Sequence, residues 1–195
     1  PAEPGAEWMV AYEKFSLSPR LRRGVTSAEP ITEPSAMSQD VLATMVTTTS
    51  YGTWLPGDLR GYVEDKRILP HEPRLLRYSE QLLSRTPVFF NADEQNRLFE
   101  ALVAAAEEFG YVVTDVSIDT WHLHWICAHG FDAVATMIGR LKNRMRQRLA
   151  RGRIWTAGYC HRCLITDADI DVARAYILRH RGCRLVAGRY PPAEP

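Results

Sequence analysis

The sequence predicts a single α+β domain built on an antiparallel sheet. Stretches rich in β-branched residues alternate with stretches whose apolar residues recur every three or four positions, and the chain has 195 residues, 46% of them hydrophobic. That length suffices for one sizeable core and is short for two domains. No apolar run is long enough for a membrane span and no secretory signal pattern is present, so a soluble, cytoplasmic protein is expected.

Both ends of the chain are expected to be disordered. Residues 1–36 and 188–195 are scattered with Pro, Glu, Ser and Ala and show no sustained period of 2 or 3.6. The ordered domain is therefore expected over residues 37–187. Because Met37 directly precedes the first ordered pattern, we hypothesise that translation can start there, and a protein beginning at Met37 should then fold.

The first predicted elements are a strand and a helix separated by a long connection. Residues 41–50 are rich in β-branched side chains and run into turn-forming residues, with a loop reaching roughly to Pro87. Asn91 and Glu94 form a potential capping box, and the helix that they begin should close at Gly110.

Two strands are expected next, over residues 111–119 and 122–128, and a tight connection should make them a hairpin. The residues of the first strand that are expected on one side are Val112, Thr114, Val116 and Ile118.

A second helix is expected over residues 132–150, a further strand over 154–165, and a third helix from Asp167 to a stop at Gly182. The order β-α-β-β-α-β is the split βαβ, ferredoxin-like arrangement, with two helices on one face of the sheet and one extra C-terminal helix. Such a fold decides no function by itself.

The sharpest chemical signal is His122-Leu123-His124 on a predicted strand. Because strand side chains alternate, both imidazoles should emerge on one face while Leu123 turns into the opposite layer. Two imidazoles placed in this way can bind one divalent ion. A single pair of this kind is more often part of a hydrogen-bond network, so a third ligand is needed.

Tyr176 and His180 provide a candidate, since a spacing of four on a helix places both side chains on one face. A tyrosine hydroxyl with its usual pKa of about 10 is a poor nucleophile, so attack on phosphorus requires a nearby cation. The alternative is structural: Tyr176 would be a half-buried aromatic residue and His180 a cation that the C-terminal end of a helix favours.

Charge is distributed unevenly along the chain. The net charge is +1, but residues 1–110 carry 16 acidic and 11 basic side chains, and residues 111–195 carry 7 and 13. Residues 133–166 include no acidic residue, whereas a solvated face usually mixes both signs, so this stretch predicts a phosphate-binding surface. The residues predicted to bind DNA are Arg140, Lys142, Arg144, Arg146, Arg148, Arg151 and Arg153, and Arg162 is the eighth cation of the stretch.

The four cysteines are expected to be free thiols, because an intracellular chain of this size rarely relies on disulfides. Cys160-x-x-Cys163 offers half of a zinc site, but no second pair of ligands accompanies it in the sequence. A structural zinc site is therefore disfavoured.

Together these patterns resemble the single-tyrosine HUH transposases, which comprise the IS200-like insertion-sequence transposases and the REP-associated tyrosine transposases. The resemblance covers roughly residues 41–185. The motifs that carry it are YGTWLPGD (51–58), WHLHW (121–125), GRLKNRMRQRL (139–149), IWTAGY (154–159) and ARAYILRHRG (173–182).

The resemblance implies a metal site and a nucleophile. In that family a histidine pair and a residue four positions after the nucleophilic tyrosine hold Mg²⁺ or Mn²⁺, which nominates His122, His124 and His180 as metal ligands and Tyr176 as nucleophile. The family's third ligand is often Gln or Asn, so His180 leaves the ion preference open.

The resemblance also implies a reaction and partners. The tyrosine attacks a single-stranded DNA phosphate, forms a 5′-phosphotyrosine link and releases a 3′-OH. The implied partners are single-stranded or hairpin DNA and a second copy of the chain in a homodimer, and a DNA-bound protein would associate with the nucleoid.

Other functions remain open from sequence alone. A non-catalytic RNA-recognition-like module shares the element order, but aromatic-rich strand motifs are not evident and imidazoles occupy the central hairpin. A related HUH nicking enzyme shares the chemistry, although such proteins usually carry accessory domains. A two-histidine phosphoesterase would need two H-x-[ST] strands, and this chain has one H-x-H.

Overall fold

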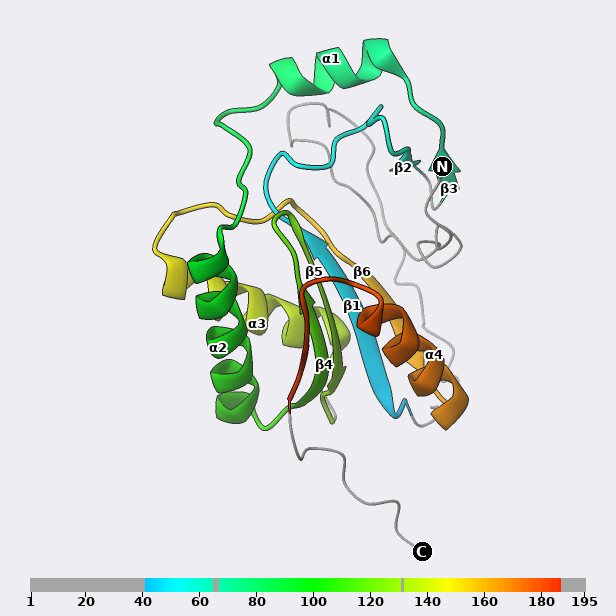
Figure 1. Ribbon diagram of the computed structural model, residues 1–195, viewed down its shortest axis with the longest axis vertical. Helices are drawn as coiled ribbons and strands as arrows, with labels where there is room; N and C mark the ends of the chain where they lie inside the picture. The colour runs from blue at the N-terminus through cyan, green and yellow to red at the C-terminus, as the bar shows by residue number, and fades with distance from the viewer. Residues whose placement is uncertain (1–40, 65–66, 131, 187–195) are drawn as a thin grey trace, which may run out of the picture.

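The computed structural model describes residues 41–64, 67–130 and 132–186. Within them, five strands form one antiparallel sheet in the order β6-β1-β5-β4-β7 (Figure 1). The predicted α+β class and antiparallel sheet are confirmed. The strands of this sheet are β1 (Ala43–Thr49), β4 (Val112–Ile118), β5 (His122–Ala128), β6 (Cys160–Leu164) and β7 (Cys183–Leu185).

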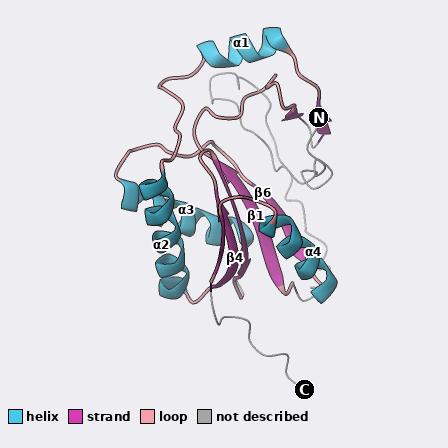
Figure 2. Ribbon diagram, in the orientation of Figure 1, coloured by secondary structure: helices cyan, strands magenta, loops and turns pink. Residues whose placement is uncertain are grey.

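Helices cover both faces of the sheet. Figure 2 shows α2 (Ala92–Phe109) and α3 (Val134–Leu149) on one side and α4 (Asp167–Leu178) on the other. The larger apolar core lies under α2 and α3, where fully buried side chains such as Leu102 and Trp125 pack together. A smaller cluster lies under α4 and includes Met45, Ile126, Leu164 and Ile177. The sheet is thus buried on both faces, and the α4 face has the smaller apolar layer.

The predicted capping box begins α2. The Asn91 side chain accepts a hydrogen bond from the Glu94 backbone N–H at 2.9 Å, and the Glu94 carboxylate accepts one from the Asn91 N–H at 3.0 Å. The helix ends at Gly110, whose φ of 72° is left-handed and suits glycine. A cap of this kind stabilises a helix by about 1 kcal/mol, so the sequence signal has a clear energetic basis.

The long connection after β1 contains structure that the sequence analysis assigned to a loop. It holds β2 (Tyr62–Glu64), β3 (Arg67–Leu69) and α1 (Pro73–Gln81). Pro73 occupies the first turn of α1 and the Glu72 side chain caps it. These elements are short, which is why periodicity over a longer window did not reveal them.

Three predicted boundaries differ from the structure. The strand expected over 154–165 is regular only in β6, and the chain before it makes a single bridge between Trp155 and Ser50. The helix α4 ends at Leu178 and not near Gly182, because a turn follows directly. The helix predicted over 132–150 is α3, which starts two residues later.

The predicted alternation along β4 holds for Val116 and Ile118 and is wrong for Val112 and Thr114. The register with β5 shifts between Val113 and Val116, which marks a β-bulge. A bulge inserts one residue and reverses the alternation beyond it. As a result Val113, Val116 and Ile118 belong to the α2/α3 core, and Thr114 does not.

No helix in the described part of the chain is both long and apolar enough to cross a membrane. The predicted extension 1–36, the hypothetical start at Met37 and the tail 188–195 lie outside the described residues. The domain boundaries of 37–187 therefore stay a prediction.

Candidate metal centre

The strand β5 presents its two histidines to the α4 face, as the alternation predicts. His122 pairs with Thr49 of β1 and His124 pairs with Thr47. Leu123 points the other way into the α2/α3 core, where it is fully buried. Both imidazoles are also buried, at 8% and 2% exposure respectively. The sheet therefore fixes two nitrogen ligands side by side in a largely dry site.

The third histidine comes from a turn after α4. The His180 backbone N–H bonds to the Ile177 carbonyl at 3.0 Å, and the Cys183 N–H bonds to the His180 carbonyl at 3.1 Å. Gly182 docks this turn on the sheet, because its carbonyl accepts a hydrogen bond from the Ile118 N–H at 3.1 Å. The spacing of four thus brings Tyr176 and His180 together, but through a turn instead of a continuous helix.

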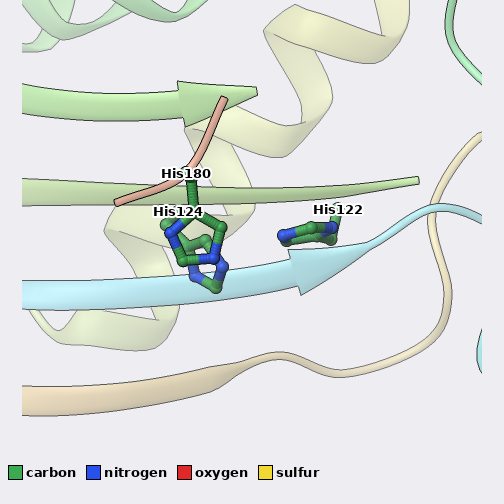
Figure 3. Close-up of side chains that lie close together, drawn as sticks. All are labelled: His122, His124 and His180. Atoms are coloured by element: carbon green, nitrogen blue, oxygen red, sulfur yellow. The ribbon is translucent and has the colours of Figure 1, made fainter. Parts of the chain in front are cut away.

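Three imidazoles converge on one point (Figure 3). The ring centroids of His122 and His124 lie 4.8 Å apart, and His180 lies 5.5 Å from the former and 4.6 Å from the latter. One ring nitrogen from each residue lies within 4.8 Å of the others, and such a group could hold one metal ion. The three predicted metal ligands are therefore brought together.

Burial keeps the two strand histidines neutral. It lowers the pKa of His122 to about 4, with His180 and Arg60 adding to the effect and Asp119 opposing it. It also lowers the pKa of His124 well below the usual value, with contributions from the neighbouring histidines. Neutral imidazole is the form that binds metal ions, so at neutral pH both side chains are in the form that a metal ion would need.

Hydrogen bonds orient two of the rings. His180 Nδ1 lies 3.0 Å from the Tyr176 carbonyl oxygen, which can only accept, so Nδ1 donates and Nε2 keeps its lone pair. His124 Nδ1 lies 2.8 Å from Thr47 Oγ1. His122 Nδ1 is buried and makes no hydrogen bond to any described residue. A buried polar atom of this kind normally has a partner, and a metal ion held by three imidazoles fits this donor set.

Tyr176 lies against the cluster. Its ring centroid is 5.2 Å from that of His124 and 4.8 Å from that of His180. The guanidinium of Arg179 lies 5.7 Å from the same ring. A phenol, three imidazoles and a cation thus share one small region of the α4 face.

The structure also places residues at the site that the sequence analysis did not single out. The Trp121 ring packs against the His122 imidazole, with ring centroids 4.1 Å apart and the planes tilted by 49°, and the Arg60 guanidinium lies 4.2 Å from the Trp121 ring. Asp115 of β4 is buried and pairs with Arg174 of α4 at 3.2 Å, which ties that helix to the sheet. Trp121 precedes His122 directly in the WHLHW motif, whereas the fold alone brings Arg60 to Trp121 and Arg174 to Asp115, so no local sequence pattern could have indicated these two contacts.

The basic helix α3 lies on the face opposite the imidazoles. Three arginines of α3, and Arg151 directly after it, have acidic partners, so the premise that these cations are unopposed does not hold in space. The ion pairs are Arg140–Asp132, Arg144–Glu108, Arg148–Glu100 and Arg151–Glu94. DNA binding by this helix remains a prediction.

Lys142 has a local structural role. Its ammonium group donates to the Gly158 carbonyl at 2.8 Å, and burial lowers its pKa to about 8. Arg146 and Arg153 take part in no ion pair within the described residues, and Arg153 lies over the Tyr51 ring. Of the cations predicted to bind DNA, these two arginines are therefore the ones whose charge neither a carboxylate nor burial offsets.

The four cysteines are free thiols, as predicted. Cys160 pairs with Thr47 and Cys163 with Thr44, so the spacing of three places the two thiols on opposite faces of β6. The metal-sized cluster found among the described residues contains no cysteine. Half a zinc site is therefore not formed by this pair.

No family model matches the sequence, and no curated protein matches it. Among solved structures, the chain is similar to a REP-associated tyrosine transposase bound to a REP hairpin, with 11% identity and a TM-score of 0.46 over 70% of this chain and 64% of that one. It is also similar to a proposed transposase from Deinococcus radiodurans R1, with 11% identity and a TM-score of 0.39 over 71% and 91%. The chain thus spans less than two thirds of the first relative's length.

Proposed function

We propose that this protein is an HUH-type transposase that cleaves and rejoins single-stranded DNA through Tyr176. The observation that carries the proposal is the contact of the Tyr176 ring with His124 and His180 inside a cluster of three imidazoles. A half-buried aromatic residue and a histidine at a helix end would explain each side chain separately. They do not explain why three imidazoles converge beside one phenol.

The three histidines would hold one divalent ion. When bound, such an ion polarises a phosphate oxygen and stabilises the charge that develops during attack on phosphorus. The resemblance of the sequence to HUH transposases suggests Mg²⁺ or Mn²⁺. Imidazole suits Mn²⁺ better than Mg²⁺, which prefers oxygen ligands, so both ions belong in any assay.

Tyr176 is the proposed nucleophile. Its Oη attacks the phosphorus in line, a new bond joins Oη to the 5′-phosphate, and the bond from phosphorus to O3′ breaks. The phenolic proton passes to water, and the leaving O3′ takes a proton from water. The leaving strand ends in a 3′-OH. Rejoining is the reverse attack by a 3′-OH on the phosphotyrosine, and because one phosphodiester replaces another, no nucleotide triphosphate is consumed.

The partners of this reaction are proposed from the same resemblance. Hairpin or single-stranded DNA is the substrate, and a second copy of the chain completes a homodimer. Arg146 and Arg153 are the strongest remaining candidates for phosphate contacts on the α3 face, since no acidic side chain of the described chain pairs with them.

A covalent-complex assay tests the proposal. A hairpin oligonucleotide labelled at its 3′ end, which is the end that would stay on the protein, is incubated with wild type and Mg²⁺ or Mn²⁺ and resolved on a denaturing gel. We expect a labelled protein band that chelator abolishes and that Tyr176→Phe and His122→Ala lack. Tyr78→Phe is the matched control, because Tyr78 is exposed on α1. A bound oligonucleotide that never becomes covalent would instead support a non-catalytic DNA-binding protein.

A further inference from the structure

Arg60 is held in one place by its own loop. Its Nε and Nη2 donate to the two carboxylate oxygens of Asp58, each at 2.8 Å, and Nη2 also donates to the Thr53 carbonyl at 2.6 Å. The Gly61 N–H bonds to the Asp58 carbonyl at 2.9 Å and closes the turn. A long, flexible side chain has thereby lost most of its freedom before any ligand binds.

The loop itself is fixed against α1. Gly57 has a φ of +85°, and a Cβ at this position would collide with the backbone of Glu72 and Leu76. Trp54 Nε1 donates to the Gly61 carbonyl at 2.7 Å. The short β2, β3 and α1 region therefore serves as a support that holds Arg60 at a defined position.

That position is the edge of the histidine cluster. The guanidinium lies 4.2 Å from the Trp121 ring, and that ring lies 4.1 Å from the His122 imidazole. Only the Trp121 ring therefore lies between the Arg60 cation and His122, a candidate metal ligand. A phosphate bound beside His122 at this edge would therefore lie close to the Arg60 cation.

Part of the guanidinium is still available. Nη1, with its two N–H groups, makes no hydrogen bond to any residue in the described part of the chain, and the side chain is 45% exposed. Guanidinium donors match phosphate oxygens in geometry and charge. The hydrogen bonds to Asp58 and Thr53 fix the loop, but they do not explain why the guanidinium also lies over the Trp121 ring beside the histidine cluster.

We propose that Arg60 binds a backbone phosphate of single-stranded DNA at the edge of the histidine cluster, close to the phosphate that Tyr176 attacks. The inference rests on the proposed function and adds a DNA-binding residue from outside the basic α3 helix. Asp58 and Trp121 act as positioning residues for this contact, because they set where Nη1 points.

Salt-dependent binding tests this contact without cleavage. Fluorescence anisotropy measures binding of a labelled oligonucleotide, with a hairpin and a single-stranded flank, to full-length Tyr176→Phe protein in Mn²⁺ over a range of salt concentrations. Adding Arg60→Gln should weaken binding about tenfold and lower the salt slope by about 0.7, the value for one phosphate on a single strand. Arg60→Lys should keep most of the slope, since it keeps the charge.

Arg97→Gln is the matched control, because Arg97 is an exposed arginine on α2, on the opposite face of the sheet. Arg97→Gln should leave the DNA affinity and the salt slope unchanged. An unchanged slope in Arg60→Gln, or an equal loss in Arg97→Gln, would overturn the proposal. Thermal unfolding of each variant separates a lost contact from a lost fold. If Arg60→Gln unfolds, Arg60→Met, which keeps the aliphatic stem and removes the charge, replaces it in the same test.

Neutral methylphosphonate links locate the contacted phosphate. Such links are placed one at a time along the single-stranded flank. At one position the link should weaken binding to the parent protein but not to Arg60→Gln. That position should lie beside the phosphodiester link that wild type cleaves. A matching position far from the cleavage point would contradict the location. If wild type forms no covalent product while the Arg60 effects hold, the proposed function fails and the contact stands; if the parent binds no DNA, both fail.

Discussion

At the scale of single residues, burial gives the histidine cluster a pH dependence that can be measured without DNA. The pKa of His122 is lowered by burial to about 4, whereas an unfolded chain restores the usual value of about 6.5. Between these values the unfolded state binds more protons than the folded state. Stability from the neutral imidazole is therefore fully present above about pH 6.5 and is lost as the pH falls toward 4.

His122→Gln should remove this pH-dependent part of the stability. Between pH 7 and pH 4.5, metal-free wild type should lose about 2 kcal/mol more free energy of unfolding than the variant, as follows from the lowered pKa of His122. Urea unfolding at both pH values in chelator measures the difference. His71→Gln, which changes an exposed histidine outside the cluster, should behave like wild type. Parallel losses in wild type and His122→Gln would contradict a buried neutral His122.

At the scale of elements, the turn after α4 decides where the third imidazole lies. A Cβ on Gly182 would meet the Ile118 backbone, including its carbonyl oxygen, at distances that real structures do not show. The obstacle is backbone and cannot move aside as a side chain can. Gly182 therefore allows the turn to lie directly on β4. The position of this turn then sets how far His180 lies above the sheet.

Gly182→Ala should displace His180 and weaken metal binding. We expect the rise in Tm that Mn²⁺ gives to wild type to be largely lost, with a further cost of about 1–3 kcal/mol in metal-free stability from overpacking. Differential scanning fluorimetry with and without Mn²⁺ measures both. Gly139→Ala in α3 is the control, because a Cβ there meets open space and alanine favours a helix. A full Mn²⁺ response in Gly182→Ala would show that the turn tolerates the added methyl group.

Local sequence signals predicted the parts of this site that depend on local physics. Alternation along β5 placed both histidines on one face, and the capping box set the start of α2. The bulge in β4 and the end of α4 at Leu178 have no such signal, because strand pairing and the docking of the turn at Gly182 on Ile118 are tertiary contacts. The approach of Arg60 to Trp121 likewise joins two segments that are distant in sequence.

At the scale of the whole molecule, charge counted along the sequence differs from charge arranged in space. Residues 133–166 contain no acidic side chain, but α2 packs beside α3 and supplies its counter-charges. Most of these pairs are exposed and contribute little to stability, between about 0 and 1 kcal/mol each. Their larger effect is on binding, since an arginine already paired with a carboxylate releases fewer counterions when it meets a phosphate.

This arrangement predicts an unequal response if the α3 face binds DNA. Replacing the unpaired Arg146 and Arg153 together by Gln should lower the salt slope of single-strand binding by about 1.4, the value for two phosphates. Replacing Arg144 and Arg148 together should lower it less, because Glu108 and Glu100 lie beside them. Anisotropy salt titrations of the two double variants make the comparison at equal charge change. An equal decrease in the two double variants would mean that the acidic residues of α2 do not screen α3. If both double variants keep the wild-type slope, DNA binds only on the face that carries the imidazoles, Tyr176 and Arg60.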